Sequence, residues 1–181
     1  MTNNSIEGVW CKDVALDYET GWICSERALQ SSIFFHLRRA RGAERVFVEP
    51  KVSYVNGSPA RVPDLILTEG NIVVAVVELK FFPEWSPIRR DLEPDVRRLR
   101  EIFQGVHGAQ WSLVSGRTSE AVMLSKDTKY YLGVVGVNVP RKMSKFDLWN
   151  MIPEQAASSF SLLVGDTASS RAVFQQHMWA P

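Results

Sequence analysis

The stretch spanning residues 72–80, Ile-Val-Val-Ala-Val-Val-Glu-Leu-Lys, is almost continuously apolar and rich in β-branched side chains. Such a run predicts a central β-strand buried on both faces, because a strand with one solvated face alternates apolar and polar residues. The run ends with the charged residues Glu78 and Lys80. Two ionisable groups are therefore expected at the end of a buried strand, and this strand constrains both the fold and the search for a site.

A helix is predicted on each side of this strand along the chain. The first spans residues 25–39, with Ser25 as N-cap and Gly42 as the stop signal. Its apolar residues recur at four-residue spacing and are Leu29, Ile33 and Leu37. The second helix opens at Pro94 and Asp95, because proline is well tolerated in the first turn of a helix. Its apolar face contains Val96, Leu99, Ile102 and Phe103.

Further strands are predicted on both sides of the second helix. Residues 46–55 form a strand in which Pro50 indicates an edge or a bulge. Asn56-Gly57 is a strong turn signal that leads into a strand at residues 60–68. Residues 130–138 form another apolar core strand. The order is helix, three strands, helix, strand, which predicts an α/β domain with a mixed central sheet flanked by helices.

The length of 181 residues fits a single domain. Its core is expected at about residues 25–138, with a C-terminal extension at residues 139–181. Residues 1–20 are expected to form an irregular or short-stranded lead-in. Within the extension the sequence predicts a short helix capped by Ser144 and Asp147, a strand at residues 160–164 and a terminal helix at residues 168–178.

Composition excludes several classes of protein. No apolar run approaches the roughly 20 residues that span a bilayer, and the N-terminus lacks the pattern of a secretory signal. Cys11 and Cys24 form no C-x-x-C pair and the three histidines are scattered, so no structural zinc site is expected. A cytoplasmic protein with reduced thiols is predicted. The formal charge of +1 is not that of a strongly basic nucleic-acid binder.

A candidate site lies where the predicted strands end. Side chains alternate along a strand, so Glu78 and Lys80 share one face and Leu79 points to the other. The hairpin before them can place Asp64 beside Glu78. Adjacent carboxylates repel, and a hard divalent cation such as Mg²⁺ relieves the repulsion by accepting oxygen ligands from both. Lys80 is then within reach to orient water or to stabilise negative charge.

This arrangement resembles the PD-(D/E)XK nuclease superfamily, whose members share the restriction-endonuclease-like fold. The matching residues are Pro63-Asp64 and Glu78-Leu79-Lys80, and Glu26 matches a glutamate that the leading helix often contributes. The resemblance covers residues 25–138 and implies an αβββαβ core. It also implies Mg²⁺-dependent cleavage of DNA or, less often, RNA, with Mn²⁺ as a substitute. Asp64 and Glu78 would bind the metal together with the Leu79 carbonyl and, as a further candidate, Glu26, while Lys80 would assist catalysis.

Other residues permit both a functional and an ordinary interpretation. The segment at residues 81–90 is predicted to be a loop, in which Trp85, Arg89 and Arg90 are candidate contacts to substrate, although loop arginines usually face water. Glu49 and Lys51 are expected to face water, as is Arg98 on the second helix.

Three hypotheses about function follow from these residues. The chain is a nuclease, a non-catalytic binding or assembly module that keeps the nuclease fold, or a small-molecule-binding α/β domain. The last would be supported if Asp64 lay far from Glu78. Six tryptophans in a short chain are compatible with a homodimer, whose second site would make the second cut in a duplex. Substrate, cleavage mode and oligomeric state are left open by the sequence.

Overall fold

The computed structural model describes residues 5–41, 45–54, 62–82, 88–104, 110–115, 118–136, 158–167 and 173–178. The helices, in chain order, are α1 (Ile6–Val9), the π-helix η1 (Trp10–Val14), α2 (Ala15–Glu19), α3 (Glu26–Arg41) and α4 (Ile88–Gln104). The strands are β1 (Arg45–Val48), β2 (Lys51–Tyr54), β3 (Leu65–Glu69), β4 (Ile72–Phe82), β5 (Gln110–Ser115), β6 (Thr118–Gly136), β7 (Phe160–Asp166) and β8 (Val173–Met178). The predicted turn at Asn56-Gly57 and the predicted helix at Ser144 and Asp147 lie outside the described residues.

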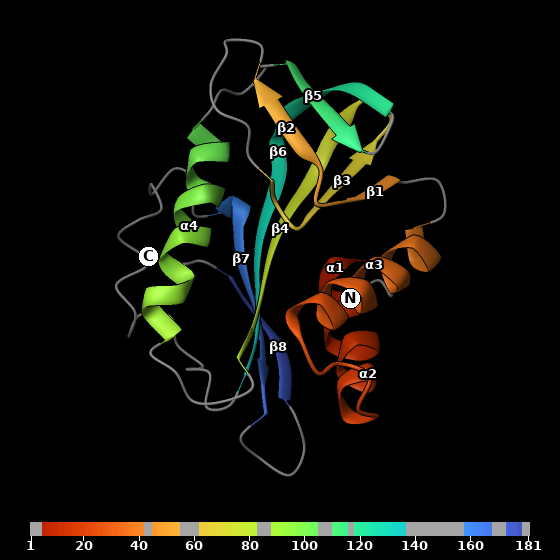
Figure 1. Ribbon diagram of the computed structural model, residues 1–181, viewed down its shortest axis with the longest axis vertical. Helices are drawn as coiled ribbons and strands as arrows, with labels where there is room; N and C mark the ends of the chain where they lie inside the picture. Colours follow the sequence, from red (N-terminus) through yellow and green to blue (C-terminus); the bar gives the residue numbers. More distant parts are fainter. Residues whose placement is uncertain are drawn as a thin grey trace.

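An eight-stranded mixed sheet forms the centre of the molecule, with the strand order β1-β3-β4-β6-β5-β2 and with β7 and β8 added beside β6. β1, β3 and β4 form an antiparallel meander, and β4 then pairs with β6 in parallel through the crossover that contains α4. The prediction that residues 72–80 form a central buried strand is confirmed, because β4 pairs on both sides and is buried over most of its length. Figure 1 shows how strongly this sheet twists and curls.

Helices cover both faces of the sheet, as Figure 1 shows: α4 lies on one side, and α1, α2 and α3 lie on the other. Each face has its own apolar core. Against α4 the sheet contributes residues such as Val76 and Leu132, and against the N-terminal helices it contributes Val77 and Leu79. The molecule is therefore a mixed α/β structure, and the predicted fold class is confirmed at this level.

The first predicted helix is confirmed as α3. Ser25 caps it as predicted, because its Oγ accepts a hydrogen bond of 3.1 Å from the backbone N–H of Ala28. The apolar residues predicted to face inward are fully buried and are Leu29, Ile33 and Leu37. The prediction for residues 1–20 is wrong over the part that the structure describes, because residues 6–19 are helical. The helical spacing of its buried residues was present in the sequence at Ile6, Val9, Trp10 and Val14.

The predicted strand at residues 46–55 is two strands. β1 pairs with β3, whereas β2 crosses to the far end of the sheet order and pairs with β5. Glu49, between them, has a φ of 46° and lies in the left-handed region, and Pro50 follows it. Pro50 thus marks a break between β1 and β2. The change of direction at Glu49 and Pro50 lets these consecutive strands take the two ends of the strand order, which closes the curled sheet.

The second helix begins earlier than predicted. α4 starts at Ile88, and Pro94 lies inside it. Leu92 explains the earlier start, because its side chain is buried one turn before Val96. Burial of this leucine stabilises the helix by about 2 kcal/mol. That gain offsets much of the cost of Pro94, which has no N–H to donate within the helix. The predicted loop at residues 81–90 is wrong at both ends, since β4 continues to Phe82 and α4 includes Arg89 and Arg90.

The C-terminal end of the sheet differs from the prediction in one element. β7 contains the predicted strand at residues 160–164, but residues 173–178 form the strand β8 instead of a helix. β8 pairs antiparallel with β7, and its Phe174 ring lies 5.6 Å from that of Trp10. Tertiary pairing and this aromatic contact decide the conformation of a segment whose local pattern is ambiguous.

Across the described ranges, no helix combines the length and apolarity needed to cross a membrane.

Gly133 allows β6 to pass close beneath Trp10. A Cβ on Gly133 would lie 2.7 Å from Leu79 Cδ2 and 3.0 Å from Trp10 Cζ3, and both of these side chains are fully buried. We expect Gly133→Ala to lower the free energy of unfolding by about 1–3 kcal/mol through overpacking, as measured by urea denaturation. Adding Leu79→Val, which removes the nearest clashing atom, should cost less than the sum of the two single changes. Full additivity would contradict this account.

Candidate active site

Asp64 is held against the end of the buried strand β4. The β3–β4 register pairs Leu65 with Val77, so its continuation places Asp64 opposite Glu78. The backbone carbonyl of Asp64 accepts a hydrogen bond of 2.9 Å from the N–H of Glu49, and its Oδ2 accepts one of 2.6 Å from the N–H of Leu79. The predicted proximity of the two carboxylates is therefore present. Asp64 does not lie far from Glu78, so the arrangement that would have supported a small-molecule-binding domain is not found.

Lys80 lies between the two helical layers. Its Nζ is 3.3 Å from Glu26 Oε1, at the first residue of α3, and 3.4 Å from Asp95 Oδ2 on α4. Glu26 had been predicted to face inward from the leading helix, and its contact with Lys80 brings it to the same site. The lysine is half-buried and has an acidic partner on each side, and its charge also acts on Asp64.

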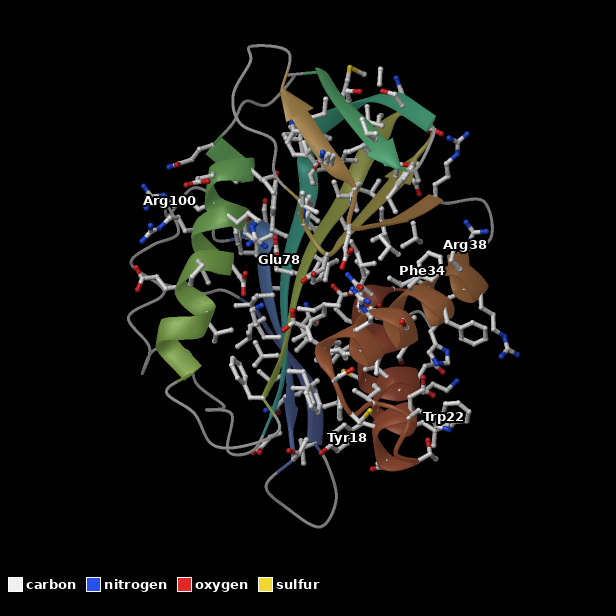
Figure 2. The ribbon with its side chains drawn as sticks, in the orientation of Figure 1. Tyr18, Trp22, Phe34, Arg38, Glu78 and Arg100 are labelled. Atoms are coloured by element: carbon white, nitrogen blue, oxygen red, sulfur yellow. The ribbon has the colours of Figure 1, made fainter. Side chains whose placement is uncertain are left out.

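Glu78 is buried, with 1% of its surface exposed, and it contacts Arg98 of α4. Arg98 Nη1 donates to Glu78 Oε2 at 2.7 Å and lies 3.5 Å from Asp95 Oδ1. Glu78 Oε1 is also buried, and among the residues that the structure describes it has no hydrogen-bond partner. The prediction that Arg98 faces water is therefore wrong, because a buried carboxylate attracts the guanidinium into the interior. Figure 2 shows Glu78 between α4 and the N-terminal helices.

Two further site residues were missed from the sequence. Asp95, only 2% exposed, comes three residues after Leu92 and four before Leu99, so it lies on the buried stripe of α4. An acidic residue inside an apolar stripe was the signal that could have identified it. Gln30 of α3 lies one turn after Glu26, and its Nε2 donates to Asp64 Oδ1 at 3.4 Å.

Burial shifts the proton affinities of the carboxylates. Desolvation raises the pKa of Asp64 to about 6, and the nearby charge of Glu26 adds to the effect, although the Leu79 N–H opposes it. Desolvation and the charge of Asp64 raise the pKa of Glu78 to about 8, against the opposing effect of Arg98. The pKa of Lys80 is raised because Asp95 and Glu26 outweigh the burial that lowers it. Perturbed carboxyl groups of this kind cluster at functional sites.

The donor set fits a hard divalent cation. When ionised, the carboxylates of Glu26, Asp64, Glu78 and Asp95 carry four negative charges, against two positive charges on Lys80 and Arg98, so the cluster has a formal charge of −2. Glu78 Oε1 is a buried acceptor to which no described residue donates. Within the described part of the chain, no three acidic, histidine or cysteine side chains already form a cage for a metal. Magnesium needs no such cage, because it commonly takes one or two carboxylates and retains several waters.

The backbone of Leu79 supplies a further oxygen. In a strand, the N–H and C=O of one residue face the same neighbour. The N–H of Leu79 binds Asp64, so its carbonyl also faces the side on which β3 has ended. Continuing the register places Pro63 opposite Leu79, and proline has no N–H to donate to that carbonyl. The Leu79 carbonyl therefore receives no hydrogen bond from the residue opposite it in this register.

Three of the remaining predicted site residues have side chains outside what the structure describes. Trp85 lies outside the described residues, and Arg89 and Arg90 occupy the first turn of α4 with side chains outside the described set. Glu49 and Lys51 are exposed, as predicted. Figure 2 shows Arg38 and Arg100, members of two arginine groups in the sequence, at opposite outer sides of the molecule and away from Glu78.

A hollow of about 500 Å³ lies elsewhere, along α2 and α3. It is lined mainly by apolar atoms, and Trp22 and Phe35 are its exposed aromatic residues. None of its lining residues belongs to the acidic cluster. At its polar side Asp17 Oδ2 is 3.0 Å from His36 Nε2 and accepts a 2.7 Å hydrogen bond from Ser32, so these groups are already paired.

Comparison of the chain with protein-family models, with curated proteins and with solved structures finds no match. The functional interpretation therefore rests on the geometry and chemistry of the cluster around Glu78.

Proposed function

We propose that this chain is a metal-dependent nuclease that hydrolyses phosphodiester bonds, with DNA as the preferred substrate, and that it belongs with the PD-(D/E)XK enzymes. The observation that carries the proposal is the meeting of Asp64, Glu78 and Lys80 at one buried strand end. The chain order α3, β1, β3, β4, α4, β6 supports it, since this is the αβββαβ order that the resemblance implies. Strands β2 and β5 are then additions to that core.

Each residue has a role that follows from its position. Asp64, Glu78 and the Leu79 carbonyl would hold Mg²⁺, with Glu26 close enough to join through a water. When bound, the ion acidifies a water and neutralises charge on the reacting phosphate. Lys80, kept protonated by Asp95 and Glu26, donates hydrogen bonds toward the attacking water or the developing negative charge. Gln30 and the Leu79 N–H hold Asp64 in its orientation.

The direct test is incubation of the purified chain with single-stranded, double-stranded and branched DNA, and with RNA, with and without Mg²⁺. We expect cleavage that requires the metal and that Mn²⁺ also supports. EDTA should abolish cleavage, and renewed Mg²⁺ should restore it. Absence of cleavage on every substrate, despite measurable metal binding, would contradict the proposal.

Asp64→Asn provides a test that separates metal binding from folding. Asparagine keeps an oxygen that can accept the Leu79 N–H, so the local structure should persist, while one anionic ligand is lost. We expect Mg²⁺ affinity to fall about 10- to 100-fold or more, with cleavage falling at least in proportion. Isothermal titration calorimetry and circular dichroism would measure binding and fold. Asp127→Asn, at an exposed position on β6, is the matched control and should change neither.

A second candidate function is a non-catalytic nucleic-acid-binding or assembly module with the same fold. The 2.7 Å contact between Arg98 and Glu78 favours it, because this pair compensates the buried carboxylate without any metal. Titration with Mg²⁺ or Mn²⁺ distinguishes the two functions. A module that uses Arg98 only as a structural counter-ion would show no saturable binding that depends on Asp64.

A further inference from the structure

Arg98 occupies the space between two buried carboxylates of the cluster. Its Nη1 lies between two buried carboxylates, 2.7 Å from Glu78 Oε2 and 3.5 Å from Asp95 Oδ1. A divalent ion shared by these oxygens would need the same space. The other oxygen of Glu78, Oε1, has no hydrogen-bond partner within the described part of the chain. The two oxygens of Glu78 therefore differ: one is already occupied by a cation from the protein, and the other is unpartnered.

The charge of the cluster leads to the same conclusion. Four carboxylates and two cationic side chains leave a formal charge of −2, which a single divalent ion cancels. A second ion would leave an excess of two positive charges in a largely buried site. Such an excess is costly without further anions. Without Arg98, however, the cluster would carry −3, and the oxygens of Glu78 and Asp95 that Arg98 now contacts would be unpaired.

We propose that Arg98 is a built-in second cation of the active site, so that each chain binds one divalent ion instead of the two that its four carboxylates could otherwise hold. The inference rests on the proposed function, since it concerns the same metal site. It makes Arg98 a positioning residue for Glu78 that also sets the number of ions bound. One third of the Arg98 side chain is exposed.

The test is a count of bound ions. Calorimetric titration of the full chain with MnCl₂ should give one ion per chain for the wild type. The electron paramagnetic resonance spectrum of bound Mn²⁺ should show no coupling between two ions. Arg98→Met removes the charge and keeps the apolar stem, and we expect it to bind two ions per chain with a coupled spectrum. Arg98→Lys, which restores a cation, should return the count to one.

Two further variants make the test specific. Arg97→Met is the matched control, because Arg97 is the preceding residue of α4, is largely exposed and pairs with Glu93 on the surface. It should leave the count at one. Arg98→Met combined with Asp95→Asn should also bind one ion, since the second ion needs Asp95. Circular dichroism confirms that each variant is folded.

The outcomes separate the two proposals. Two ions bound to the wild type, or one ion bound to folded Arg98→Met, would overturn the role of Arg98 and leave the metal site itself intact. No saturable binding to the wild type would overturn both this inference and the proposed nuclease. One ion in the wild type and two in Arg98→Met would support both the metal site and the role of Arg98.

Discussion

Lys80→Ala is expected to abolish metal-dependent cleavage while the chain still folds and still binds metal. Lys80 contributes a cation, not a ligand, so removing it makes the cluster more negative and should leave Mg²⁺ affinity unchanged or higher. The rate should nevertheless fall about 10²–10³-fold or more, the usual cost of losing a group that stabilises charge in a transition state. Cleavage rate under saturating metal, together with the dissociation constant from calorimetry, measures both effects.

Three controls make this result interpretable. Lys126→Ala removes an exposed lysine from β6 and should have no effect. Lys80→Arg keeps a positive charge but changes its shape and donor geometry, and should restore only part of the activity. Loss of metal binding in Lys80→Ala would show that the lysine acts through the structure of the cluster. Undiminished cleavage by a pure preparation would contradict its assigned role.

Glu78→Gln is expected to stabilise the metal-free protein at alkaline pH and to eliminate metal binding. The pKa of Glu78 is raised from 4.5 to about 8, so the folded state binds its proton more tightly than the unfolded state does. Between these two pH values, folding takes up a proton, and the free energy of unfolding therefore falls as pH rises. Below pH 4.5 Glu78 is protonated in both the folded and the unfolded state, so burying it carries no charge penalty. Above pH 8 the folded state holds the charged carboxylate, and the full cost of burying that charge lowers the free energy of unfolding.

Glutamine imitates the protonated acid and removes this pH dependence. Each pH unit corresponds to ~1.4 kcal/mol, so the gain above pH 8 has an upper limit of about 5 kcal/mol, and structural relaxation reduces it to about 1–3 kcal/mol. Urea denaturation in the presence of EDTA measures this difference. Below pH 4.5, Glu78→Gln should have no higher free energy of unfolding than the wild type, and above pH 8 it should have a clearly higher one. Added Mg²⁺ should stabilise only the wild type.

The matched control for this experiment is Glu93→Gln, on α4, the helix that carries Arg98. Glu93 is exposed and pairs with Arg97, so its loss should change stability by less than about 1 kcal/mol at either pH. If Glu78→Gln were destabilised to the same extent at both pH values, the Arg98 contact would be more important than the desolvation of Glu78. The pH-dependent part of the prediction would then be wrong.

Several features of this protein follow from the sequence alone. The β-branched run predicts the buried strand β4, because its apolar residues are continuous and local. The two-residue period of a strand places Glu78 and Lys80 on one face without any knowledge of neighbours. The side-chain cap at Ser25 and the four-residue spacing after it predict α3 for the same reason: each depends only on residues within one or two turns.

The tertiary structure decided whatever depends on partners distant in the chain. Arg98 enters the site because a buried Glu78, 20 residues away along the chain, needs a counter-charge, and Asp95 contacts the cations of Lys80 and Arg98. No spacing rule within α4 reveals these contacts with β4. β2 pairs with β5 across about sixty residues, and β8 is a strand because β7 offers an unpaired edge and Trp10 a ring for Phe174. Local periodicity determines which face a side chain occupies, whereas the identity of its partner depends on loop closure and burial, which are properties of the whole chain.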